Sequence, residues 1–154
     1  MSQLNEKRFA IALLLVMTAA LATACSGPFV VFPGGALDGP VEPVPASFEP
    51  FADVETIQLE TRPHDPYSVN VVGAVVGERL YVSGGGGKTT WIENIEADPR
   101  VRARIEGVVY ELGAHRVEDD AEIAEFGEVW TEKVAFGRDP TQFDEVWIYR
   151  LEAR

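Results

Sequence analysis

Residues 83–89 (SGGGGKT) place four glycines directly before a lysine and a threonine. The phosphate-binding loop of nucleotide hydrolases also ends in Gly-Lys-Thr, but it needs a glycine five positions before Gly87, where this chain has Val82. The spacing therefore excludes a nucleotide hydrolase. Flexible backbone followed by Lys88, Thr89 and a helix start still predicts an anion site, and the alternative is a mobile loop with a solvated lysine.

The remaining polar candidates are scattered along the chain. His64 lies in a proline-bounded turn, where it could be a surface ligand or a general base, whereas His115 lies on an expected strand, where histidines more often pack. Three arginines alternate over residues 100–104, and pairing with the surplus carboxylates is expected there in preference to anion binding. Because Cys25 is the only cysteine, an intramolecular disulfide and a multi-cysteine metal site are excluded, and no metal is expected.

Length and charge narrow the classes of function. The 154 residues suit one compact domain. With 25 acidic against 13 basic residues, the formal charge of −12 would repel phosphate backbones, so no nucleic-acid partner is expected. An aromatic content of 10% argues against disorder over most of the length.

The first 24 residues have the pattern of a bacterial secretory leader. Lys7 and Arg8 precede an uncharged apolar run, Phe9–Ala24, that is too short for a comfortable transmembrane helix and ends in small residues. The sequence LATAC at 21–25 resembles a lipobox, in which the cysteine receives diacylglycerol and becomes the mature N-terminus. Residues 1–24 are thus predicted to be a lipoprotein signal peptide and Cys25 a lipidation site. The alternative is an ordinary signal peptide that leaves a free thiol.

A lipid on Cys25 would make membrane lipid a partner and place the protein in the cell envelope. Its mature body would carry 11 basic and 24 acidic residues, a charge of −13. Ser26 after the cysteine is typical of sorting to the outer membrane, on its periplasmic face, if the host has two membranes. Residues 25–50 are rich in proline and glycine and are predicted to be a tether, although the apolar patch at 29–32 could pack on the domain as an edge strand.

The body, residues 51–154, is predicted to be mostly β-structure with two helices, so a small barrel is expected rather than a doubly wound sheet. Period-2 alternation and turn residues predict strands, and near-helical apolar spacing predicts helices. The expected strands are 53–61, 67–76, 79–83, 101–106, 108–117 and 145–151, and the expected helices are 88–97 and a segment capped by residues 119–120 that continues to about 133.

A longer stretch, Leu80–Val117, resembles the middle of the pyridoxamine 5′-phosphate oxidase-like split barrels, which include flavin- and deazaflavin-binding reductases. Lys88, Trp91 and Asn94, followed by Asp98-Pro99-Arg100-Val101, meet the pattern of that superfamily. With the flanking strands, the resemblance covers about 100 residues. It implies a six-stranded split barrel, often a homodimer with the cofactor phosphate at the subunit interface.

The resemblance also implies site residues. Lys88 and Thr89, and less directly Ser83 and Thr61, match the phosphate contacts, and Trp91 could line a ring pocket. Glu60 departs from the pattern, because a carboxylate in the first strand would repel phosphate unless Arg62 or Lys88 pairs with it.

Two classes of function remain open from the sequence. The protein is either a flavin mononucleotide- or deazaflavin-dependent oxidoreductase whose chemistry is carried by the cofactor, or a non-catalytic envelope protein that binds haem or another small molecule or has a structural role.

Overall fold

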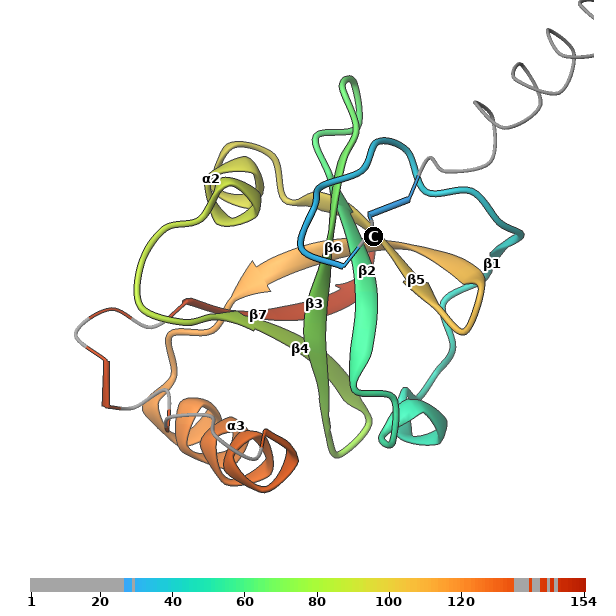
Figure 1. Cartoon of the computed structure of the whole chain (residues 1–154). Coiled ribbons are helices and arrows are strands. Elements are labelled where there is room, and N and C mark those ends of the chain that lie inside the picture. Colours follow the sequence, from blue (N-terminus) through green and yellow to red (C-terminus); the bar gives the residue numbers. More distant parts are fainter. Residues whose placement is uncertain (1–26, 29, 135–138, 140–141, 144, 146) are drawn as a thin grey trace, which may run out of the picture.

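A computed structural model of the chain describes residues 27–28, 30–134, 139, 142–143, 145 and 147–154 (Figure 1). The predicted signal peptide and Cys25 lie outside the described residues. Among the described residues, no helix is both long enough and apolar enough to cross a membrane.

Strands make up most of the described chain. The strands are β1 (Val41–Glu42), β2 (Thr56–Thr61), β3 (Tyr67–Val76), β4 (Arg79–Gly84), β5 (Arg100–Ile105), β6 (Val108–Arg116) and β7 (Trp147–Ala153). The helices are the 3-10 turn η1 (Glu49–Phe51), α2 (Thr90–Ala97) and α3 (Asp120–Lys133). The prediction of a mainly β body with two inserted helices is confirmed.

Six antiparallel strands form a closed barrel. Neighbours pair in the order β6-β5-β2-β3-β4-β7, and β6 pairs again with β7 to close the ring. The short strand β1 lies outside this ring and runs parallel to β6. The predicted fold class, a six-stranded split barrel, is therefore confirmed. Full closure leaves none of the six strands with an unpaired edge.

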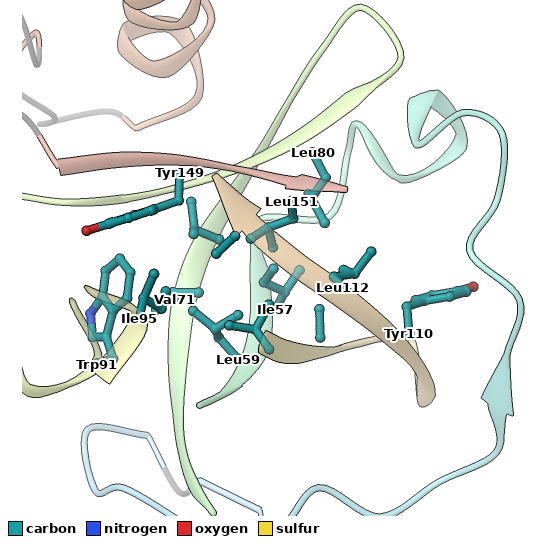
Figure 2. Packing of buried hydrophobic residues seen from close by; sticks show 14 of the residues in the cluster. Ile57, Leu59, Val71, Leu80, Trp91, Ile95, Tyr110, Leu112, Tyr149 and Leu151 are labelled. Carbon is teal, nitrogen blue, oxygen red and sulfur yellow. The ribbon is translucent and has the colours of Figure 1, made fainter. Parts of the chain in front are cut away.

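The barrel interior is filled by alternating side chains from every strand. On β2, Ile57 and Leu59 point inward and are almost fully buried, as their period-2 spacing predicts. Helix α2 presents Trp91, Ile92 and Ile95 to the same core. Figure 2 shows Trp91 and Ile95 at one end of the row of core side chains and Tyr110 at the other.

Helix α3 covers the outside of the barrel, where a second apolar cluster forms. Phe126 on α3 is fully buried against Ala74, Tyr81 and Ile148, which come from β3, β4 and β7. The predicted cap is present, because a side-chain oxygen of Asp119 accepts a 2.9 Å hydrogen bond from the Glu122 amide.

Part of the segment predicted as a tether contacts the barrel. Leu37 and Phe48 are buried, and Phe48 belongs to the main core cluster. Upstream of these, the described residues of the apolar patch, Val30, Val31 and Phe32, do not form a continuous edge strand. Their side chains are exposed, and this region meets β3 through a bridge between Gly34 and Ser68 and through a hydrogen bond from Asn70 to the Val30 carbonyl.

Candidate functional site at the ends of helix α2

The predicted anion site lies at an open helix end. Lys88 and Thr89 are both exposed, and Thr89 is the N-cap of α2 in an extended conformation (φ −92°, ψ 166°). Its side chain makes no capping hydrogen bond, so the first-turn amides of α2 are not satisfied by the cap residue. These amides, the helix dipole and the Lys88 ammonium together favour an anion at this point.

Trp147 at the start of β7 connects the lysine to the barrel. The Lys88 Nζ lies 4.8 Å from the centre of the Trp147 ring, and the Arg116 Cζ lies 4.0 Å from it. Trp147 is 4% exposed, and its Nε1 is buried with no hydrogen-bond partner among the described residues. Two cations therefore contact this one aromatic ring, and the Arg116 guanidinium also lies 3.8 Å from the Glu96 carboxylate.

The glycine loop borders this region with open space. A cavity of about 230 Å³ is lined by Gly86, Gly87, Phe143 and Glu145. A Cβ atom at Gly87 would meet no other atom within 4 Å. Ser83 lies just before the loop and pairs with Ile148 in the β4–β7 ladder. A ligand therefore has room to approach the backbone of this loop, between Phe143 and Glu145.

Trp91 is placed in the barrel core, and it is not among the residues that line the cavities described here. It is 7% exposed and meets Tyr149 edge to face, with ring centres 6.0 Å apart. The Tyr149 hydroxyl donates a 2.8 Å hydrogen bond to Glu96. Burial, as the larger cause, and this hydrogen bond, as the second, raise the pKa of Tyr149 well above its usual range. The tyrosine is therefore held neutral, with its proton directed at the α2 carboxylate.

Thr61 contacts Asn94 in the C-terminal half of α2, whereas Lys88 precedes the first residue of the helix. Its hydroxyl donates to the Tyr67 carbonyl (3.2 Å) and accepts from the Asn94 amide (2.9 Å), and the residue is 1% exposed. Asn94, singled out in the sequence as part of the superfamily pattern, ties α2 to the end of β2. The Thr61 hydroxyl is therefore engaged by two contacts within the protein.

A second cavity, of about 280 Å³, lies at this other end of α2 beside the β2–β3 turn. Arg62, His64, Asn94 and Asp98 are among its lining residues. Arg62 has a left-handed backbone (φ 57°), and its Nε is buried without a hydrogen-bond partner among the described residues. From the sequence, Arg62 was expected only as a partner for Glu60. Because Arg62 directly follows a strand and precedes Pro63, the sequence could have predicted a turn that carries a cationic side chain at this point.

Glu60 is neutralised by a residue that was not expected. The predicted partners were Arg62 or Lys88, but Arg102 binds it, with Nη1 3.0 Å from Oε2. The reason is strand register, since Glu60 on β2 stands directly opposite Arg102 on β5. The other arginines of that strand pair with Asp98 and Asp38, so the predicted carboxylate pairing is confirmed.

A third cavity, of about 270 Å³, lies over this ladder and carries three arginines. Each of them is paired with a carboxylate: Arg100 with Asp98, Arg102 with Glu60 and Arg154 with Glu111. Its positive charge is thus balanced within the protein. Among the described residues, no group of three His, Cys, Asp or Glu side chains is arranged to hold a metal ion.

The family model of the F420H(2)-dependent quinone reductases matches residues 59–141. The chain belongs to this family. The match includes the end of β2, strands β3 to β6, the glycine loop, α2 and α3, and it ends before Phe143, Glu145 and Trp147. Among curated proteins, none matches the sequence significantly.

Solved structures of the same fold are distant in sequence. An FAD-binding protein from Mesorhizobium loti is 15% identical, with a TM-score of 0.50 over 68% of this chain and 82% of its own. A structure described as a domain-swapped dimer is 14% identical, with a TM-score of 0.54 over 65% of this chain and 81% of its own. A Listeria innocua protein provisionally assigned as a pyridoxamine 5′-phosphate oxidase is 16% identical, with a TM-score of 0.49 over 63% and 82%. The family and fold place this quinone reductase relative in the pyridoxamine 5′-phosphate oxidase-like superfamily.

Proposed function

We propose that this protein is a deazaflavin-dependent oxidoreductase that is held in the cell envelope by a lipid on Cys25. In this proposal Lys88, Thr89 and the first turn of α2 bind a phosphate of the cofactor. The observation that carries the proposal is the pairing of an exposed lysine with an uncapped helix N-terminus inside the segment matched by the family model.

The described residues fit such a cofactor. The helix end and Lys88 supply donors and positive charge for a phosphate, and the glycine loop beside them leaves a cavity of about 230 Å³ with Phe143 on its wall. At the far end of α2, Arg62 lines the cavity of about 280 Å³ and is a second cation for an extended cofactor tail, with its Nη2 3.2 Å from Asp65. The pairing of Glu60 with Arg102 removes the repulsion that the sequence predicted.

When bound, a reduced deazaflavin supplies a hydride to its substrate. The residues of this chain bind and orient the cofactor. Lys88 supplies a positive charge for its phosphate, the glycine loop lets the cofactor approach the backbone closely, and the contacts of α2 with the barrel hold the helix in place. The Tyr149 hydroxyl is committed to Glu96, which leaves proton delivery to solvent or substrate. Flavin mononucleotide shares the phosphate and the ring and is the competing cofactor.

Equilibrium binding of coenzyme F420 and of flavin mononucleotide to the full chain, followed by absorbance and fluorescence, tests the proposal. Lys88→Ala should weaken binding of the preferred cofactor by about tenfold or more, as expected for loss of one charge-assisted phosphate contact, whereas Lys88→Arg should retain most of it. Arg154→Ala removes one positive charge at the C-terminus and is the matched control, expected to leave binding unchanged.

Absence of binding by either cofactor would contradict the oxidoreductase function. The non-catalytic alternative, an envelope protein that binds haem or another small ligand, would then take its place, and haem added to the same protein would test it by its visible spectrum.

The anchoring part of the proposal is supported by residues 1–25, with their basic start, apolar run and lipobox-like end. Its test is the intact mass of protein extracted from membranes, which should exceed that of residues 25–154 by the mass of the acyl groups. Cys25→Ser should abolish this increase and release the protein from the membrane fraction. An unmodified mass for the wild-type protein would contradict lipidation.

Homodimerisation is also part of the proposal, supported by the same-fold structure that is described as a domain-swapped dimer. Sedimentation equilibrium should give twice the mass of the mature chain. A monomer mass with cofactor bound would show that one subunit completes the site alone.

A further inference from the structure

The exposed apolar side chains of the described chain gather on one short loop. Val30, Val31 and Phe32 are 67%, 83% and 66% exposed, and Val41 is the one other large hydrophobic residue among the described residues with comparable exposure. We call the described residues 27–28 and 30–34 the apolar loop. Three adjacent hydrophobic side chains facing water are unfavourable unless a partner covers them.

The apolar loop is attached to the barrel at Val30 and at Gly34. The Val30 carbonyl accepts a 2.9 Å hydrogen bond from Asn70, and Gly34 exchanges two 2.9 Å backbone hydrogen bonds with Ser68. Both partners lie near the start of β3, so the loop has a defined position on one end of the barrel. The apolar loop is therefore held in place by hydrogen bonds to the barrel.

The loop also closes tightly on itself. A Cβ atom at Gly34 would come within 2.4 Å of the Gly27 backbone and 2.5 Å of Pro28, so only glycine permits this approach. Val30 adopts a left-handed backbone (φ 52°), which is strained for a β-branched residue. The fold thus keeps a strained turn at Val30, and the side chains of Val30, Val31 and Phe32 are exposed there.

We propose that the apolar loop rests in the surface of the lipid bilayer and orients the barrel beside its anchor. This inference rests on the proposed lipidation of Cys25. Val31 is six positions after Cys25 in the sequence, which is a reach of at most about 20 Å, so an acylated Cys25 keeps the loop near the headgroups.

Charge and area favour lipid over another protein as the occupant. No charged residue occurs from Ser26 to Leu37, in a protein whose mature body carries a charge of −13, so this loop is the element best able to approach a membrane. A stable contact with a second copy needs about 800 Å² from each partner, far more than three side chains supply. Apolar side chains at the acyl–headgroup boundary need no such area.

The loop fixes which end of the barrel faces the membrane. The β3–β4 turn at residues 77–78 follows the end of β3, about 30 Å from the strand start that holds the loop, and it lies at the other end of the barrel in Figure 1. This turn should therefore point into the aqueous phase.

Spin labelling of the full acylated protein tests the proposal. In that protein Cys25 is modified, so Phe32→Cys and Glu78→Cys each supply a single thiol for a nitroxide, the second being the control in the exposed β3–β4 turn. The proteins are reconstituted in phosphatidylcholine vesicles. Collisions with oxygen and with a water-soluble nickel chelate are then measured by power-saturation electron paramagnetic resonance.

The label at residue 32 should show a several-fold lower nickel accessibility and a higher oxygen accessibility than the label at residue 78. Equal nickel accessibility at the two positions, in protein whose intact mass confirms acylation, would overturn the loop contact while leaving the anchor in place. A wild-type mass without acyl groups would overturn both. Dipolar broadening at position 32 in detergent would instead identify a contact between two copies and also overturn the proposal.

Discussion

Arg102 on β5 binds Glu60 on β2 across the outside of the barrel, with Nη1 3.0 Å from one carboxylate oxygen and 3.2 Å from the other. The Glu60 side chain is 5% exposed and also accepts a hydrogen bond from the Leu37 amide. One carboxylate therefore connects two strands and the segment that precedes the barrel. A buried charge with two partners is stable only while both remain.

Replacing Arg102 with methionine should therefore lower the free energy of unfolding by about 3 kcal/mol, because Glu60 would be left buried without its charged partner. Urea unfolding followed by tryptophan fluorescence measures the change. Arg100→Met, which breaks the exposed pair with Asp98, is the control and should cost less than about 1 kcal/mol. Equal losses in the two variants would show that Glu60 does not depend on Arg102.

The two glycines at the start of the loop should respond differently to alanine. At Gly84 a Cβ atom would lie 2.4 Å from the Ile92 side chain, which is fully buried, so Gly84→Ala should destabilise the fold by about 1–3 kcal/mol. At Gly85 a Cβ atom would meet nothing within 4 Å, and Gly85→Ala should stay within about 0.5 kcal/mol of the wild type. Thermal unfolding of both variants tests the packing of α2 on β4. A neutral Gly84→Ala would contradict it.

The hydrogen bond between Asn94 and Thr61 should couple α2 to the barrel. A double-mutant cycle with Asn94→Ala and Thr61→Val should give a coupling energy of about 1 kcal/mol, the usual net value of one intramolecular hydrogen bond. If the two changes were simply additive in urea unfolding, the contact would not hold the helix.

Tyr81 should make stability depend on alkaline pH. Its hydroxyl donates a 2.7 Å hydrogen bond to Glu122 on α3. Burial is the larger cause and this hydrogen bond the second cause of a rise in the pKa of Tyr81 from 10.0 to about 12. The folded state thus favours the neutral phenol. The resulting stabilisation is complete below pH 10 and is lost as the pH rises through about 12.

Comparison of the wild type with Tyr81→Phe isolates this effect. The free energy of unfolding of the wild type should fall more steeply between pH 10 and 12 than that of the variant, and one late-titrating tyrosinate absorbance should disappear in the variant. Parallel pH profiles would indicate that Tyr81 titrates alike in the folded and unfolded states.

Much of the fold could be predicted because the apolar pattern of a strand or helix is set by residues that are consecutive in the sequence. The predicted strand at 67–76 coincides with β3, and the apolar spacing of Trp91, Ile92 and Ile95 marks the buried face of α2. The predicted cap Asp119 is observed for the same reason, since a cap and the amide it accepts from are three residues apart. Lys88 and Thr89 were predicted to form an anion site from residues adjacent in the sequence.

Tertiary structure decided what depends on register between distant segments. Glu60 and Arg102 are 42 residues apart, and only the pairing of β2 with β5 shows that Arg102, rather than a neighbour in sequence, binds the carboxylate. Likewise, Thr61 matched a phosphate contact by its position in the chain, but the fold directs its hydroxyl to Asn94 and the Tyr67 carbonyl. Local periodicity determines which face of a helix or strand is apolar. The partner of each polar side chain depends instead on the register between the paired strands of the barrel and on where α2 packs against them.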